Sequence, residues 1–132
     1  MTLAELVAWG EAFGRAASAP LVVTLSGELG AGKTTLAQAI CRGYGVREEV
    51  TSPTYAIVQE YAAPRSPVLH LDLYRLKGVE DLANVGWDDV IAADALVIVE
   101  WPERAHTQLP DHVPIRLAHD AADPARRLLL AG

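Results

Sequence analysis

Apolar residues along the chain fall into short runs of strand length, separated by stretches in which they recur with helical spacing. The run 21–25, Leu-Val-Val-Thr-Leu, is rich in β-branched residues and predicts a buried strand. The same kind of pattern predicts strands at 56–61, 68–74, 95–100, 113–118 and 126–131. Because only the short turn 64–67 separates the second strand from the third, we expect these two to be antiparallel neighbours.

Helical spacing marks the beginning of the chain. Thr2 and Glu5 match a capping box, so a helix is predicted to begin there and to end before Pro20. Its apolar face is expected to contain Leu3, Leu6, Val7, Gly10, Phe13 and Ala17. This helix either packs on the sheet or lies beside a bound nucleotide base.

Further helices are predicted between the strands. One covers 35–42 and stops at the glycines of 43–45. Gly78 and Gly86 each precede acidic residues, which favours a helix start at both positions. Strands and helices therefore alternate along 132 residues with 51% hydrophobic content, which is enough for the core of one domain, 1–132.

The charge balance is acidic, since 11 Lys and Arg against 17 Asp and Glu give a net charge of −6. Gripping nucleic acid unaided requires a basic face, so this composition argues against direct binding of RNA or DNA. Cys41 is the only cysteine, which excludes a disulfide within the chain and favours a buried apolar role. With neither a basic and apolar leader nor an apolar run of membrane length, a cytoplasmic protein without membrane contact is expected.

The first strand leads directly into residues 27–34, Gly-Glu-Leu-Gly-Ala-Gly-Lys-Thr, which match the pattern G-x-x-x-x-G-K-[ST] of a phosphate-binding loop. A strand before the loop and a helix after it are the context that this motif requires. Backbone N–H groups would cradle the phosphates of ATP or ADP, with Lys33 on the β- and γ-phosphates and the Thr34 hydroxyl on Mg²⁺. The predicted fold is therefore α/β, a P-loop NTPase-like three-layer sandwich with a mixed, mainly parallel central sheet.

Two acidic residues lie in or at the end of predicted strands. Glu100 closes the apolar run 95–100, which is the form of a Walker B element, whose acid meets Mg²⁺ or its water shell. Asp72 shares one strand face with His70 and is either a site residue or a solvent-facing residue on an edge strand. We interpret His70 as a structural histidine. Asp72 and Glu100 are expected to converge on one metal, at the end of the sheet where α/β proteins bind ligands.

The roles of residues 51–54 and 126–127 each have two possible interpretations. Thr51, Ser52 and Thr54 crowd hydroxyl groups into a segment that either senses a γ-phosphate or forms an ordinary polar turn. Arg126 and Arg127 either touch a nucleotide or are solvated residues of an edge strand.

With these pieces in place, the chain resembles the TsaE family, small bacterial ATPases needed for threonylcarbamoyladenosine (t6A) formation on tRNA. Four motifs match in order and spacing, namely GELGAGKTT at 27–35, TSPTY at 51–55, LHLDLYRL at 69–76 and IVEWPER at 98–104. The resemblance implies ATP and Mg²⁺ binding, weak hydrolysis by the chain alone, and joint action with the TsaB and TsaD proteins, of which TsaD catalyses the modification. It implies contact with tRNA only through that complex.

The resemblance also implies roles for individual residues. Lys33, Glu100 and Asp72 are the expected catalytic residues, and Thr34 joins the two acids as a metal ligand. Trp101 and Asp72 match positions tied to the activity of the family. The expected nucleotide-binding residues are Gly27, Glu28, Leu29, Gly30, Ala31, Gly32, Lys33, Thr34, Thr35 and Trp101.

Rival functions are weighed against the same residues. A GTPase is disfavoured because the sequence has neither the N-K-x-D nor the D-x-x-G signature. A small-molecule kinase needs a lid and an acceptor pocket, for which little of the chain remains. A nucleotide-sensing adaptor would bind ATP and partners without turnover. An arginine acting on the transition state would be Arg75, Arg104 or a residue supplied by a partner.

Overall fold

The computed structural model describes residues 1–28, 30–50, 58–74, 86–103, 109–123 and 126–131. Several predictions fall outside these ranges and stay predictions: those on Leu29, the segment 51–55, the helix start at Gly78, Arg75 and Arg104. Among the described residues, no helix is long and apolar enough to cross a membrane.

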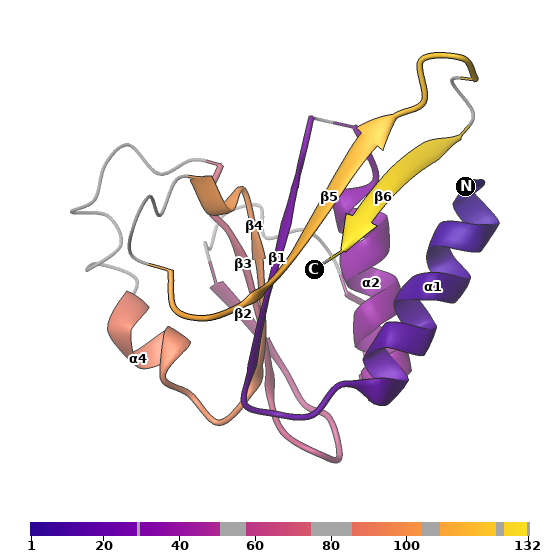
Figure 1. Ribbon diagram of the computed structural model, residues 1–132. Coiled ribbons are helices and arrows are strands. Elements are labelled where there is room, and N and C mark those ends of the chain that lie inside the picture. Colours follow the sequence, from indigo (N-terminus) through magenta and orange to yellow (C-terminus); the bar gives the residue numbers. More distant parts are fainter. Residues whose placement is uncertain (29, 51–57, 75–85, 104–108, 124–125, 132) are drawn as a thin grey trace.

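Six strands form one sheet in the order β2-β3-β4-β1-β5-β6 (Figure 1). Their bounds are β1 (Leu21–Gly27), β2 (Val58–Tyr61), β3 (Val68–Asp72), β4 (Leu96–Glu100), β5 (Val113–His119) and β6 (Arg127–Ala131). The four inner strands pair in parallel, whereas β2 on β3 and β6 on β5 are antiparallel. The mixed, mainly parallel sheet and the antiparallel pair predicted around the turn 64–67 are both confirmed.

Helices cover the two faces of the sheet. Figure 1 shows α1 (Leu3–Ala16) and α2 (Lys33–Tyr44) together on one side and the short α4 (Trp87–Ile91) on the other. Alternation along β4 divides its side chains between two cores. Leu96 and Ile98 join the core under α1 and α2, while Val97 and Val99 join the core that contains Trp87. The predicted three-layer α/β architecture is therefore confirmed.

The ends of the first two helices follow their local sequence. In α1, the Thr2 hydroxyl accepts a hydrogen bond from the backbone N–H of Glu5 at 3.2 Å, and the Glu5 carboxylate accepts one from the Thr2 N–H at 2.8 Å. This is the predicted capping box. The helix α2 begins after Gly32 and ends at Gly45, which has a left-handed backbone (φ 108°) that favours glycine.

One prediction about α1 is wrong. Leu3 was expected on the packed face, but its side chain is 54% exposed, whereas Leu6 is fully buried. Leu6 lies beside Gly32, where α2 begins. Leu3 is one turn earlier in α1 and therefore extends beyond the surface that α2 offers for packing.

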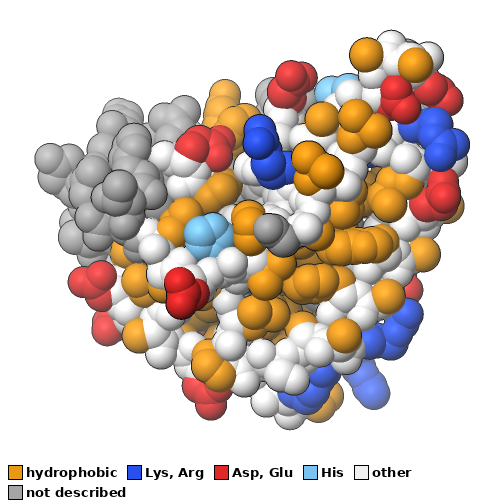
Figure 2. Space-filling view, in the orientation of Figure 1, with side chains coloured by type: hydrophobic (Ala, Val, Ile, Leu, Met, Phe, Trp, Pro, Cys, Tyr) orange, Lys and Arg blue, Asp and Glu red, His pale blue; other side chains and the backbone are white. Residues whose placement is uncertain are grey.

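The distribution of charged side chains on the surface is consistent with the acidic composition. Figure 2 shows acidic and basic side chains dispersed over one face, with hydrophobic side chains between them. On this face the described residues form no continuous basic surface. Cys41, expected to be buried, is fully so inside α2.

Candidate functional site

The loop between β1 and α2 wraps around the amine of its own lysine. Lys33 Nζ donates to the carbonyl oxygens of Gly27 at 2.5 Å and Glu28 at 3.0 Å. Gly30 (φ 80°) and Gly32 (φ 104°) have left-handed backbones, a conformation that side chains with a Cβ rarely adopt. The pattern of glycines in the sequence thus corresponds to the turns that direct the loop around Lys33.

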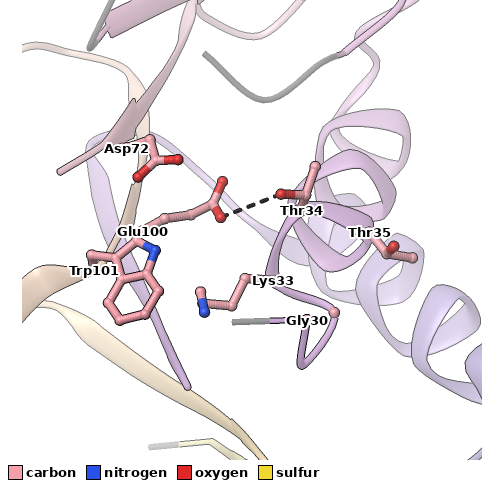
Figure 3. Close-up of a pocket in the computed structure, with 8 residues that line it drawn as sticks. Gly30, Lys33, Thr34, Thr35, Asp72, Glu100 and Trp101 are labelled. Atoms are coloured by element: carbon pink, nitrogen blue, oxygen red, sulfur yellow. Dashed lines mark hydrogen bonds between the residues drawn. The ribbon is translucent and has the colours of Figure 1, made fainter. Parts of the chain in front are cut away.

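Asp72 and Glu100 lie side by side at the carboxyl ends of β3 and β4. The parallel register pairs the Cα atoms of these two residues directly. Both strands are interior in the sheet order, so the alternative that placed Asp72 on an edge strand is wrong. Thr34, in the first turn of α2, points toward Glu100, with 3.5 Å between Thr34 Oγ1 and Glu100 Oε1 (Figure 3).

These side chains enclose one pocket of about 310 Å³. Figure 3 shows Lys33, Glu100 and Trp101 around its centre, with Asp72 next to Glu100. The described lining consists of Gly30, Gly32, Lys33, Thr34, Thr35, Asp72, Glu100 and Trp101. All of these were predicted as site residues, although they come from three separate parts of the chain. Gly27 and Glu28 contribute through the carbonyls that hold Lys33, and Ala31 is fully buried within the loop.

The Lys33 amine is buried, and the nearby carboxylates only partly offset the cost of burying its charge. The residue is only 5% exposed. Burial lowers the pKa of Lys33 from its ordinary value, while the nearby carboxylates of Glu100, Glu103 and Asp72 act in the opposite direction. Because the lowering dominates, an additional anion in the pocket would stabilise the charged amine. A phosphate chain is an anion of suitable size and charge.

Trp101 forms one wall of the pocket from an unusual backbone conformation. It is the only residue other than glycine with a positive φ (60°) among those described. Its N–H donates to the carbonyl of Leu25 at 3.2 Å, and its ring lies 4.1 Å from Lys33 Nζ and 4.9 Å from the Tyr74 ring. Such strained residues persist where the surroundings hold them, and they cluster at functional sites. In the sequence, only its position directly after the strand that ends at Glu100, together with the family resemblance, indicated that Trp101 belongs to the site.

Two residues near the pocket were not predicted as part of the site. His70 was interpreted as structural, and it is indeed fully buried, but its Nε2 lies 2.5 Å from Glu100 Oε2. Glu103 is exposed and acts on Lys33 through its charge. The alternation of β3 places His70 and Asp72 on the same face, and this spacing was the available signal for His70.

The oxygen atoms facing the pocket have the chemistry that Mg²⁺ prefers. Thr34 offers a hydroxyl, and Asp72 and Glu100 offer carboxylates. Among the described residues, no group of three or more His, Cys, Asp or Glu side chains is arranged to hold a metal. Mg²⁺ is commonly held by one or two carboxylates together with substrate phosphates and water, and this donor set fits that mode of binding.

The basic residues at the end of the chain lie against the start of it. Arg126 Nη2 is 3.6 Å from Glu5 Oε1, and Arg127 Nη2 donates to the carbonyl of Gly30 at 3.4 Å. The backbone of Arg127 also exchanges hydrogen bonds with that of Met1. Arg127 therefore touches the glycine-rich loop, and a contact with nucleotide stays a prediction for both arginines. That α1 lies beside a bound nucleotide base also stays a prediction, although Leu6 of this helix lies next to Gly32 of the loop.

Comparisons with known proteins agree with one another. A family model described as "Threonylcarbamoyl adenosine biosynthesis protein TsaE" matches residues 1–128. A TsaE protein of Treponema pallidum is 33% identical over 123 residues, which are 93% of this chain and 90% of the relative. A TsaE protein of Haemophilus influenzae is 39% identical over 110 residues, or 83% of this chain and 69% of the relative.

A solved structure is similar over the entire fold. The crystal structure of Bacillus subtilis YdiB superimposes with a TM-score of 0.81 at 27% sequence identity, covering 100% of this chain and 81% of YdiB. The family match, the relatives and this structural likeness point to one conclusion. The chain belongs to the TsaE family of threonylcarbamoyladenosine biosynthesis proteins.

Proposed function

We propose that this chain binds Mg·ATP in the pocket between the glycine-rich loop and the carboxyl ends of β3 and β4, and hydrolyses it slowly. The observation that supports this most directly is the convergence of Lys33, Thr34, Asp72 and Glu100 on one pocket. A lysine, a hydroxyl and two acids are the groups with which phosphate-loop ATPases hold phosphates and magnesium.

Each residue has a separate task in this proposal. Lys33 exchanges its loop carbonyls for the β- and γ-phosphates, and the backbone N–H groups of the loop bind the remaining phosphate oxygens. Thr34, Glu100 and Asp72 would hold Mg²⁺, which neutralises charge on the phosphates when it is bound. Glu100 or Asp72 also orients the attacking water. Trp101 forms the wall that shields Lys33 from solvent.

Weak turnover by the isolated chain is consistent with the composition of the pocket. Its described lining includes one lysine and no arginine. Arginines that stabilise the transition state accelerate phosphoryl transfer by roughly 10³–10⁵. A partner that supplied such an arginine, or placed one from this chain, would therefore stimulate hydrolysis.

We infer that the partners are the TsaB and TsaD proteins and that the chain acts in the cytoplasm as their ATPase in t6A formation on tRNA. The TsaE family membership supports the pathway. The net charge of −6 favours docking on a protein complex over direct binding of tRNA. ATP binding would prepare the chain for docking, and hydrolysis would release or reset the complex.

Titration calorimetry and turnover assays test this function. The purified chain should bind ADP and ATP with Mg²⁺ and hydrolyse ATP weakly, and the TsaB–TsaD pair with tRNA should raise the rate clearly. Absence of nucleotide binding by folded protein would refute the proposal, and an unchanged rate in the mixture would refute the partnership.

A nucleotide-sensing adaptor is separated from an ATPase by one variant. Glu100→Ala should bind ATP but support no repeated rounds of tRNA modification. If this variant hydrolyses no ATP and still supports many rounds, turnover is unnecessary and the adaptor is the correct description.

A further inference from the structure

His70 occupies a position where an apolar residue would be expected. It lies in the interior strand β3, has no exposed surface, and shares its strand face with the buried Val68. Its register partner across β4 is Ile98, which is also fully buried. Burying a polar ring costs free energy unless its hydrogen-bonding atoms find partners.

Only one nitrogen of this ring has a partner among the described residues. Nε2 lies 2.5 Å from Glu100 Oε2, whereas Nδ1 is buried without a hydrogen bond. Packing alone would therefore be served better by leucine or valine, which would leave no buried nitrogen unpaired. The interaction with Glu100 is what distinguishes histidine from those residues at this position.

The two oxygens of Glu100 point to different neighbours. Oε2 meets His70, and Oε1 lies 3.5 Å from the hydroxyl of Thr34 at the edge of the pocket. Glu100 is itself only 2% exposed, so its carboxylate has little solvent to interact with. By engaging one oxygen, His70 restricts the rotation of the carboxylate and leaves the other oxygen directed at Thr34.

We propose that His70 is a positioning residue, which holds the Glu100 carboxylate so that Oε1 faces the magnesium and water side of the pocket. This inference rests on the proposed function, because it assigns a purpose to the orientation of Glu100. His70 touches neither nucleotide nor metal in this arrangement. Residues that orient metal ligands in this way typically change metal affinity or activity by about 10–100-fold when they are replaced.

Magnesium dependence of nucleotide binding separates a positioning role from a merely structural one. We compare His70→Leu with Leu71→Val, a change at the next residue of β3 that faces the opposite core. His70→Leu should raise the Mg²⁺ concentration needed for half-maximal tightening of ADP binding by about tenfold or more. ADP affinity without Mg²⁺ should stay within about twofold of wild type, because the loop contacts are unchanged.

A conservative replacement of His70 gives a second test of the same role. His70→Gln keeps an N–H donor and should recover much of the magnesium dependence lost in His70→Leu. The inference is overturned if Leu71→Val, at a similar loss of thermal stability, shifts the magnesium dependence as much as His70→Leu does. It is equally overturned if His70→Leu leaves that dependence at the wild-type value.

A measurement on the protein without nucleotide keeps this inference separate from the proposed function. Two-bond ¹H–¹⁵N spectra should show a hydrogen on Nε2 of His70, and the Nε2 signal should move in Glu100→Gln. A hydrogen on Nδ1 with a bare Nε2 would overturn the positioning role even if Mg·ATP binds. Failure of wild type to bind Mg·nucleotide would instead refute the proposed function, while the spectra still report on the His70–Glu100 contact.

Discussion

Asp72 and Glu100 are direct register partners on the neighbouring parallel strands β3 and β4. Each is the last residue of its strand, so both carboxylates reach the end of the sheet where the glycine-rich loop leaves β1. Parallel pairing sets this proximity, because equivalent ends of parallel strands lie at the same edge. The acidic side of the pocket thus depends on strand order more than on any local motif.

Removing the charge of either acid should separate binding from turnover. Glu100→Gln and Asp72→Asn are nearly isosteric, so ADP should still bind while the ATPase rate falls by about 10² or more, the usual contribution of a residue that positions or activates water. Steady-state ATPase assays together with calorimetry measure the two effects. Glu60→Gln, an exposed change on β2, serves as the control and should leave both values unchanged. Wild-type turnover in both site variants would contradict the assignment of these acids.

Removing the lysine should instead weaken nucleotide binding. Lys33→Ala deletes a buried cation at the start of α2, and the affinity for ADP should fall at least tenfold, or about 1.4 kcal/mol. Arg42→Ala, near the other end of the same helix, is the matched control because Arg42 pairs only with Glu11 at the surface (3.5 Å) among the interactions described. Equal affinities for the two variants would show that the pocket is not the nucleotide site.

Two glycines should tolerate no side chain, although alanine is the better helix former. An added Cβ at Gly14 would lie 2.1 Å from the carbonyl oxygen of Ile40, and one at Gly43 would lie 2.0 Å from that of Glu11. Helix propensity favours alanine by about 1 kcal/mol. Overpacking against backbone atoms costs typically 1–3 kcal/mol or more, so both variants should be net destabilised in urea unfolding.

The exposed position Ala12 calibrates this comparison, because Ala12→Gly should show the propensity effect without the steric one. A higher unfolding free energy in Gly14→Ala or Gly43→Ala would contradict the close approach of α1 and α2 at these glycines.

The capping box should make stability depend on pH. Hydrogen bonds from the Thr2 backbone and side chain lower the pKa of Glu5 below its ordinary value of 4.5. A lowered pKa in the folded state means that the carboxylate stabilises the fold above about pH 4.5 and loses this effect as the pH falls through the folded pKa. Wild type should therefore be more stable than Glu5→Gln at pH 7, and the difference should shrink toward pH 3. Thermal melts at both pH values measure it, and a constant difference would contradict the capping role.

Cys41 should be unreactive while the protein is folded. Burial raises the pKa of its thiol to about 12, so almost no thiolate exists at pH 8. An aromatic disulfide reagent should label one thiol per chain rapidly in denaturant and only slowly in buffer. Immediate labelling of the native protein would mean that α2 does not bury this residue.

Local sequence patterns determined most of the elements and the loop. The capping box at Thr2, the glycines of 27–32 and the apolar runs act through neighbouring backbone geometry, so they can be read without the fold. The acids Asp72 and Glu100 were recognisable because carboxylates stand out in apolar strands.

Only the tertiary structure decided how these pieces meet. The order of strands made β3 an interior strand and so placed Asp72 beside Glu100 rather than at an edge. Leu3 is exposed because it lies beyond the end of α2. His70, which was interpreted as structural, is buried in contact with the site residue Glu100. These outcomes depend on contacts between residues far apart in the chain, which the spacing of nearby residues does not contain.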